Sequence, residues 1–205
     1  FLDEPEEAAE VINGRARALS CPVYPVRANK SLDFSLDFHY DKKNRFTMPH
    51  CALYQRENLP LALTAAGAAL GRVDQAAFQK GIDSFLWPSR FEELSPGVIL
   101  DGAHNPDGMR AFLASVREDG CVGERTLILA MLRGKDYQGV CAEVAGSGLF
   151  SGIICTELPV ARSLEAEALY RCFQGVYAIR ISRSRTPKQA LREAERTKRA
   201  GDLIY

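Results

Sequence analysis

In the second half of the chain, short apolar runs alternate with longer amphipathic runs. This pattern predicts strands at Val98–Leu100, Thr126–Met131, Gly152–Thr156, Val176–Ile179 and Asp202–Tyr205, and helices at Pro106–Glu118, Tyr137–Ala145, Ser163–Phe173 and Pro187–Arg199. Strands that alternate with helices of this length imply right-handed crossovers and a mainly parallel sheet with helices on both faces. The pattern therefore predicts an α/β domain.

The first half of the chain follows a different pattern. It predicts helices at Asp3–Leu19, Tyr54–Leu70 and Asp74–Phe85, an extended piece at Cys21–Val26, and a hairpin whose strands Leu32–Tyr40 and Arg45–Met48 are joined by the turn Asp41–Asn44. Pro88 and Pro96 then stiffen a linker. The change of pattern places a domain boundary near residues 85 to 95 and predicts domains at residues 1–86 and 87–205.

The composition argues against several classes of partner. With 46% hydrophobic and 25% charged residues, the chain has the composition of a soluble globular protein. Twenty-six basic residues balance 26 acidic ones, so no general field attracts nucleic acid or an anionic membrane. No apolar run approaches the roughly 18 residues of a membrane-spanning helix. We interpret one local basic cluster as a solvated face; it comprises Arg180, Arg183, Arg185 and Lys188.

The six cysteines are far apart, and no two have the CxxC spacing of common metal sites. Several lie in apolar runs, where a reduced cysteine serves as a small core residue. They are Cys21, Cys51, Cys121, Cys141, Cys155 and Cys172. This usage argues against a metal site and favours a reducing cytoplasm.

The highest density of candidate functional residues occurs in the stretch from Trp87 to Gly108, WPSRFEELSPGVILDGAHNPDG. Asp101 follows an apolar strand, and His104 and Asn105 precede Pro106, which suits the first position of a helix. Asp101 could instead be a structural turn residue, and His104 or Asn105 could be a helix cap. Because three polar groups at one strand end exceed what one cap requires, we favour a ligand site. The stretch contains neither a Walker A motif nor a GxGxxG fingerprint.

Other polar residues are weaker candidates. Arg90 lies on the linker and could clamp a phosphate, because a guanidinium offers fixed bidentate donors; a surface cation is the alternative. Lys135 and Asp136 follow another strand, and Arg162 has a similar but weaker position. Asn58 begins an alanine-rich helix, where a carboxamide needs a partner if it is buried.

Four motifs together resemble those of folylpolyglutamate synthase and dihydrofolate synthase, members of the Mur ligase superfamily. WPSRFE resembles the WPGRFE linker of that family, LDGAHNPDG its DGAHNP signature, AMLRGKD its G-x-L-x-DKD loop, and YQRENLPLALTAA its YQ-x-x-N-x-x-x-A helix. The motifs occur in the family's order and cover most of residues 50 to 175. Two positions depart from the pattern: Ser89 replaces the linker glycine, and Gly134 replaces an acid before Lys135.

The resemblance implies an ATP- and magnesium-dependent ligase that joins L-glutamate to a folate or dihydropteroate carboxylate through an acyl phosphate. It implies that Asn58 contacts the adenine, Arg90 the ATP phosphates and Asp101 the nucleotide. His104 is then placed near the glutamate or the reaction centre, and Lys135 near a substrate. The implied site lies between domains, in a cytoplasmic monomer with small-molecule substrates and no nucleic acid or membrane partner.

The resemblance also implies that the chain is the C-terminal half of such a ligase. Residues 1–86 are then the end of the central ATPase domain, and residues 87–205 a Rossmann-like C-terminal domain truncated at its end. Both ends look like cuts, and the family's P-loop, magnesium ligands and most of its folate site belong to a preceding region. A non-catalytic Rossmann-like binding module from a Mur ligase relative is the alternative. Dihydrofolate synthesis, polyglutamate extension and both together stay open.

Overall fold

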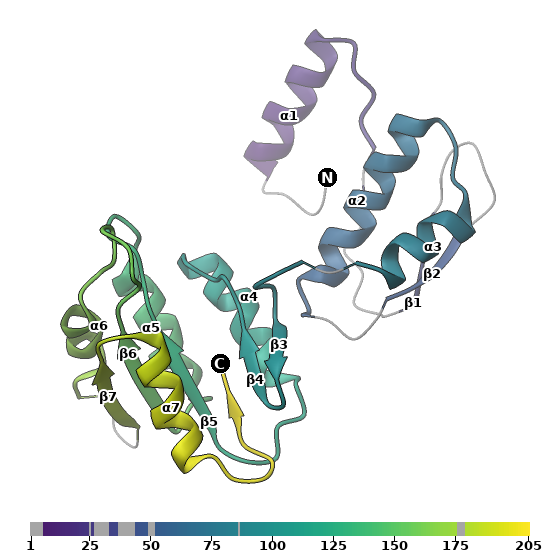
Figure 1. Cartoon of the computed structure of the whole chain (residues 1–205). Helices are drawn as coiled ribbons and strands as arrows, with labels where there is room; N and C mark the ends of the chain where they lie inside the picture. Colours follow the sequence, from purple (N-terminus) through teal and green to yellow (C-terminus); the bar gives the residue numbers. More distant parts are fainter. Residues whose placement is uncertain are drawn as a thin grey trace. The chain divides into compact units, whose positions relative to one another are not determined.

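The chain forms two compact units, Phe1–Leu86 and Trp87–Tyr205. The computed structural model describes residues 6–24, 26, 33–36, 44–48, 52–85, 87–175 and 179–205. The boundary between the two units lies between Leu86 and Trp87, within the range of residues 85 to 95. Figure 1 shows the elements of both units along the chain.

The first unit is built from a hairpin and helices. Its elements are α1 (Glu6–Ala18), β1 (Asp33–Leu36), β2 (Asn44–Thr47), α2 (Gln55–Leu70) and α3 (Gln75–Asp83). The predicted hairpin is confirmed, since β1 and β2 pair antiparallel. A small apolar cluster holds β2, α2 and α3 together; it comprises Phe46, Met48, Leu63 and Ile82.

The ends of these elements are set by local chemistry. Asp74 is the N-cap of α3, where its side chain accepts the amide of Ala77 at 3.0 Å. Gly71 ends α2 in a left-handed conformation. The alanine-rich α2 is buried only at Pro60, Leu63 and Gly67. The first residues of the helix expected at Asp3–Leu19 and most of the expected turn Asp41–Asn44 lie outside the described residues.

The second unit is an α/β domain around one mainly parallel sheet, as predicted. The strand order is β3-β4-β8-β5-β6-β7, and every pairing is parallel except that of β3 with β4. The strands are β3 (Glu92–Ser95), β4 (Val98–Leu100), β5 (Arg125–Leu129), β6 (Gly152–Thr156), β7 (Arg180–Ser184) and β8 (Leu203–Ile204). The last strand of the chain thus lies in the middle of the sheet, between β4 and β5.

Helices cover both faces of this sheet (Figure 1). They are α4 (Pro106–Arg117), α5 (Tyr137–Ser147), α6 (Ala166–Phe173) and α7 (Pro187–Thr197). Residues of β6 alternate between the faces: Ile153 and Cys155 belong to the core under α4, α5 and α6, whereas Ile154 belongs to the core under α7. Every residue of β6 is therefore buried, as expected for an inner parallel strand.

Two strands differ from the predictions. The linker contains an edge strand, β3, because the turn at Pro96 and Gly97 lets Glu92–Ser95 fold back onto β4; Gly97 has the left-handed φ of 72° that this turn needs. Most of the strand expected at Val176–Ile179 lies outside the described residues, and the strand β7, at Arg180–Ser184, was not predicted. β7 lies at the edge of the sheet, where it pairs with β6. Because an edge strand can be polar, β7 lacks the apolar run on which the strand predictions were based.

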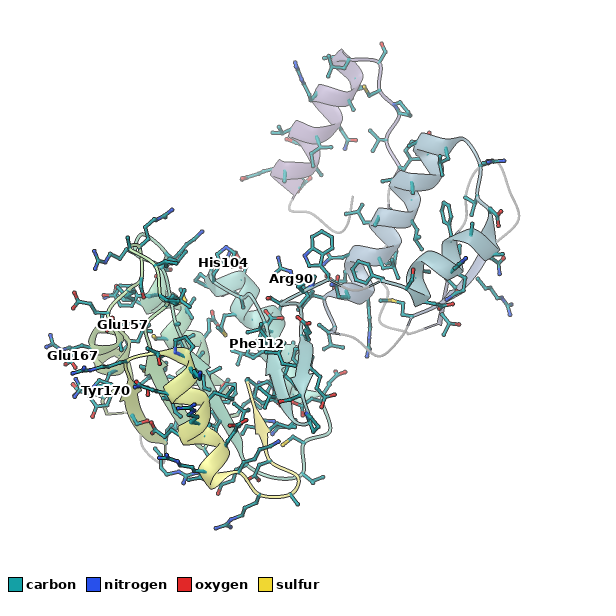
Figure 2. All side chains as sticks on the ribbon, viewed as in Figure 1. Arg90, His104, Phe112, Glu157, Glu167 and Tyr170 are labelled. Carbon is teal, nitrogen blue, oxygen red and sulfur yellow. The ribbon has the colours of Figure 1, made fainter. Side chains whose placement is uncertain are left out.

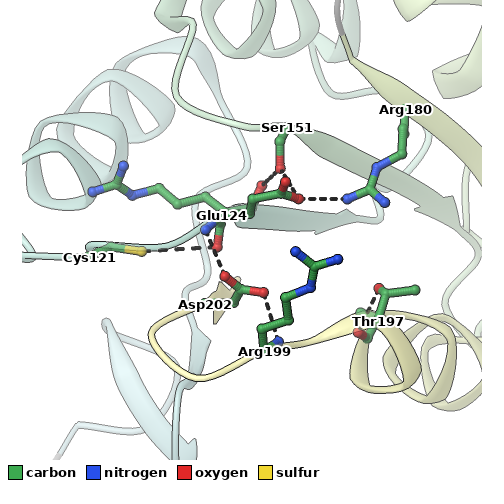
Figure 3. A network of polar contacts seen from close by, with 9 residues as sticks. Cys121, Glu124, Ser151, Arg180, Thr197, Arg199 and Asp202 are labelled. Carbon is green, nitrogen blue, oxygen red and sulfur yellow. Dashed lines mark hydrogen bonds and ion pairs between the residues drawn. The ribbon is translucent and has the colours of Figure 1, made fainter.

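Polar contacts tie the elements together at the end of the sheet where its parallel strands begin (Figure 3). Asp202 accepts the amides of Glu124 and Arg199, both at 2.8 Å. The Glu124 carboxylate in turn accepts from Arg180 at 2.7 Å and from Ser151 at 3.1 Å. The network therefore connects the segments before β5, β6 and β8 to the first residue of β7. All four residues of the predicted basic cluster are exposed, as expected for a solvated face.

Candidate functional site

The loop after β4 forms one polar rim of the second unit. We call residues Asp101 to Asn105 the strand-end loop. Asp101 uses both carboxylate oxygens within the unit: Oδ2 accepts the amide of Phe91 at 2.9 Å, and Oδ1 accepts the amide of Ala103 at 2.8 Å. The alternative of a structural turn residue is therefore correct in part. Asp101 fixes its own loop and the segment before β3 to each other.

The segment before β3 has an unusual backbone. Ser89 and Phe91 have positive φ angles of 59° and 55°, which only glycine adopts at low cost. Ser89 donates its amide to Glu92 Oε2 at 2.8 Å, and its carbonyl accepts the amide of Gly102 at 2.8 Å. Two strained residues thus flank Arg90, and each is held by a hydrogen bond.

Arg90 is exposed and lies against the strand-end loop. A β-carbon at Gly102 would be 3.3 Å from Arg90 Nη1, so the glycine leaves room for the guanidinium. No carboxylate among the described residues pairs with it. An exposed guanidinium in a defined place can receive an anionic ligand.

His104 and Asn105 complete the strand-end loop. The Nδ1 atom of His104 lies 2.9 Å from the carbonyl oxygen of Gly102. If Nδ1 donates to that carbonyl, the neutral ring keeps a lone pair on Nε2. Asn105 is the N-cap of α4 and accepts the amide of Gly108 at 2.7 Å, so the capping alternative holds for Asn105. Arg90 and His104, labelled in Figure 2, are thus the exposed cationic or titratable groups of this rim.

A pocket of about 480 Å³ opens beside the strand-end loop. Asp101 and His104 line its polar side, and apolar residues from β4, β5 and α7 line the rest. Thr156, at the end of β6, also lines this pocket, and its buried hydroxyl has no hydrogen-bond partner among the described residues.

Tyr205 closes the base of this pocket. Burial, together with a hydrogen bond to Asp119, raises the pKa of its phenol. Asp119 also pairs with Arg125, whose guanidinium lies 2.9 Å from Oδ1. That carboxylate raises the pKa of Arg125. The three side chains therefore connect the segment after α4 to β5 and to the residue after β8.

The structure brings together only some of the predicted site residues. Arg90, Asp101 and His104 meet at the strand-end loop. Lys135 is exposed after β5 and does not line the pocket, and Asp136 is the N-cap of α5. The backbone carbonyl of Arg162 accepts the amide of Arg133. Asn58 belongs to the first unit, where its side chain donates to Gln55 at 3.3 Å.

Sequence reasoning missed the role of three residues in the linker. Ser89, Phe91 and Glu92 build the strained turn around Arg90, and Phe91 also packs against Phe112 and Tyr205. A serine at a position where a glycine is expected was the one available signal. This serine indicated that the position is unusual but did not indicate that its backbone is left-handed.

Comparison with known families finds one match over the second unit. The family model described as "Mur ligase, glutamate ligase domain" matches residues 89–205, which is more than half of the chain. Its match begins within the segment before β3 and runs through β8. No group of three metal-ligating side chains and no helix suited to cross a membrane occurs among the described residues.

Curated and solved relatives extend this similarity. A probable bifunctional folylpolyglutamate synthase/dihydropteroate synthase of Halobacterium salinarum is 31% identical over 74% of this chain and 18% of its own length. Escherichia coli FolC in complex with DHPP and ADP superposes with a TM-score of 0.78 at 23% identity, over 98% of this chain and 48% of FolC. The bifunctional folylpolyglutamate synthase/dihydrofolate synthase of Yersinia pestis, complexed with AMPPNP and Mn ion, has a TM-score of 0.74 at 22% identity, over 98% of this chain and 47% of its own.

These relatives confirm the resemblance carried by the four motifs. The solved structures show the fold, since their identities are below 25%. The chain spans about half the length of the solved chains it matches and a smaller share of the archaeal relative.

Proposed function

The chain belongs to the Mur ligase family through its glutamate ligase domain, and from this we propose that it is the C-terminal half of an ATP-dependent ligase. The ligase adds L-glutamate to the carboxylate of a folate or a dihydropteroate. In this proposal residues 1–86 are the end of the central ATPase domain and residues 87–205 the glutamate ligase domain. The carrying observation is the strand-end loop, where Arg90, Asp101 and His104 of the family motifs meet.

The proposed reaction needs the carboxylate to become an electrophile. A carboxylate oxygen bonds to the terminal phosphorus of ATP as the bond from that phosphorus to the bridging oxygen breaks, which gives an acyl phosphate and releases ADP. The glutamate nitrogen then forms a bond to the acyl carbon, the carbon–oxygen bond to phosphate breaks, and the nitrogen loses a proton. Positioning and neutralisation of the phosphate charge supply the rate.

The residues of this chain have defined roles in the proposal. Arg90 donates to phosphate oxygens, and the strand-end loop with Asp101 faces the nucleotide. His104, with Nε2 available as an acceptor, receives the proton of the attacking nitrogen. Asn58 contacts the adenine, and Lys135 contacts a substrate. We propose that the magnesium ion that accompanies ATP is bound by residues outside these 205, in keeping with a solved relative about twice as long that is complexed with AMPPNP and Mn ion.

The test is an ATP-dependent assay of the longer ligase that carries this chain, with labelled glutamate and either dihydropteroate or tetrahydrofolate as acceptor. We expect turnover with at least one acceptor, and a fall in kcat/KM of about 100-fold or more for His104→Ala. Arg192→Ala, which removes an exposed cation of α7, serves as the control and keeps full activity. Full activity of His104→Ala would refute the proposed site.

The 205-residue chain by itself is expected to show no turnover with either acceptor, because it contains no Walker A loop to hold the phosphates. Glutamate addition by the isolated chain contradicts this expectation. A longer protein that binds ATP but turns over neither acceptor supports the alternative of a non-catalytic binding module.

A further inference from the structure

The segment before β3 combines backbone strain with an exposed functional side chain. Ser89 and Phe91, on either side of Arg90, both have left-handed backbones. Such conformations cost of order 1–3 kcal/mol each and persist only where surrounding contacts impose them. A bulky residue such as Phe91 is a clear outlier in this region. The contacts that impose this conformation therefore point to a role in function.

Those contacts come from one carboxylate and one loop. Asp101 Oδ2 accepts the Phe91 amide at 2.9 Å, and the Gly102 amide donates to the Ser89 carbonyl at 2.8 Å. The Phe91 ring is anchored as well, with its centroid 6.0 Å from that of Phe112 and 6.3 Å from that of Tyr205. The backbone on both sides of Arg90 is thus fixed to the strand-end loop and to the core.

We propose that Asp101 is the positioning residue of Arg90. By accepting the Phe91 amide, its carboxylate holds the strained turn that keeps Arg90 beside Gly102. Asp101 then contributes to the reaction through the guanidinium. This inference rests on the proposed function for its kinetic consequence, whereas its structural consequence is independent of any activity.

The chain offers a matched control for Asp101. Glu93 Oε1 accepts the amide of Gly97 at 2.9 Å, so it is a second carboxylate that holds a backbone amide of the same hairpin. Its bond lies at the opposite end of β3 from Arg90. Asp101→Ala and Glu93→Ala therefore each remove a carboxylate that accepts a backbone amide, but only Asp101→Ala removes the bond to the strained turn.

The structural test uses the 205-residue chain and measures amide hydrogen exchange and the backbone order parameter of Arg90 by NMR. In Asp101→Ala we expect the Phe91 amide to exchange at least tenfold faster. The order parameter of Arg90 falls from about 0.85, typical of rigid backbone, to below about 0.6. Glu93→Ala leaves both values unchanged. Unchanged values in Asp101→Ala, or the same changes in Glu93→Ala, overturn the proposal.

The kinetic test uses the longer ligase and a double-mutant cycle of Arg90→Ala and Asp101→Ala. Alanine removes both acceptor oxygens of Asp101, including the one that accepts the Phe91 amide. If Asp101 acts through Arg90, each single variant loses about 10- to 100-fold in kcat/KM, and the double variant is within about twofold of Arg90→Ala. Losses that multiply overturn the proposal. A longer protein without ligase activity contradicts the proposed function instead, and the NMR measurement then decides the positioning role.

Discussion

Ser89 adopts a left-handed backbone without being glycine, and this has a measurable cost. Its φ is 59°. Ser89→Gly removes a strain of roughly 1–2 kcal/mol and adds roughly 0.5–1 kcal/mol of unfolded-state entropy. The bonds made by the Ser89 amide and carbonyl are backbone contacts and survive the change. We expect the free energy of unfolding to rise by about 0.5–1 kcal/mol, measured by urea denaturation.

A second serine of the same segment serves as the control. Ser95 lies in β3 and is exposed. Ser95→Gly is expected to lower the free energy of unfolding, because Ser95 has no left-handed backbone to relieve and glycine adds only unfolded-state entropy. If Ser89→Gly destabilises the protein as much as Ser95→Gly does, the left-handed backbone at Ser89 carries no strain.

At the scale of single residues, the sequence predicted which residues form the strand-end loop better than it predicted their hydrogen bonds. Asp101, His104 and Asn105 could be located from a strand end followed by Pro106, and Asn105 is indeed the cap. The bond from the Phe91 amide to Asp101 spans ten positions and depends on the fold of β3 onto β4. A contact of this kind has no local signal, so it could only come from the structure.

Among the elements, burial decided which were predictable. The inner strand β6 is buried throughout and was placed correctly as Gly152–Thr156. The edge strands β3 and β7 are polar and were missed, because an edge strand needs no continuous apolar run. The central place of β8 between β4 and β5 was not predictable either, since strand order depends on packing between distant parts of the chain.

Asp202 connects β8 to its neighbours through its charge. The amides of Arg199 and Glu124, which donate to its carboxylate, lower the pKa of Asp202 below its ordinary value. A carboxylate with a depressed pKa in the folded state stabilises the fold above its unfolded-state pKa, and this stabilisation is lost as the pH falls through the folded-state pKa. We therefore expect Asp202→Asn to be less stable than the parent near pH 7. The difference shrinks below about pH 4.

The measurement is a series of urea denaturation curves between pH 2 and pH 7. Glu118→Gln removes an exposed carboxylate of the same unit and is the control for net charge. Its difference from the parent is expected to stay small across the series. A deficit of Asp202→Asn that is the same at pH 2 and pH 7 would mean that the charge of Asp202 contributes nothing to its bonds.

At the scale of the whole molecule, the described residues of each unit form their own apolar clusters, and those of the second unit are larger. The cluster in the first unit comprises Phe46, Met48, Leu63 and Ile82. In the second unit one cluster reaches from Met109 to Tyr205 and draws on three helices and two strands, and a further cluster lies under α7. The change of pattern near residue 90 was enough to predict the division. The size of each apolar cluster depends on which faces of the helices and strands are buried. The sequence pattern shows this burial only in part.

Because each unit has its own apolar core, each can unfold in its own transition. Leu169 in α6 is fully buried, so Leu169→Ala is expected to cost about 2–5 kcal/mol and to lower the transition of the second unit by roughly 10 °C or more. Leu63→Ala in α2 lowers only the transition of the first unit. Scanning calorimetry of the parent and both variants tests this. If both substitutions shift one shared transition, the chain unfolds as a single cooperative body and the two cores are not independent.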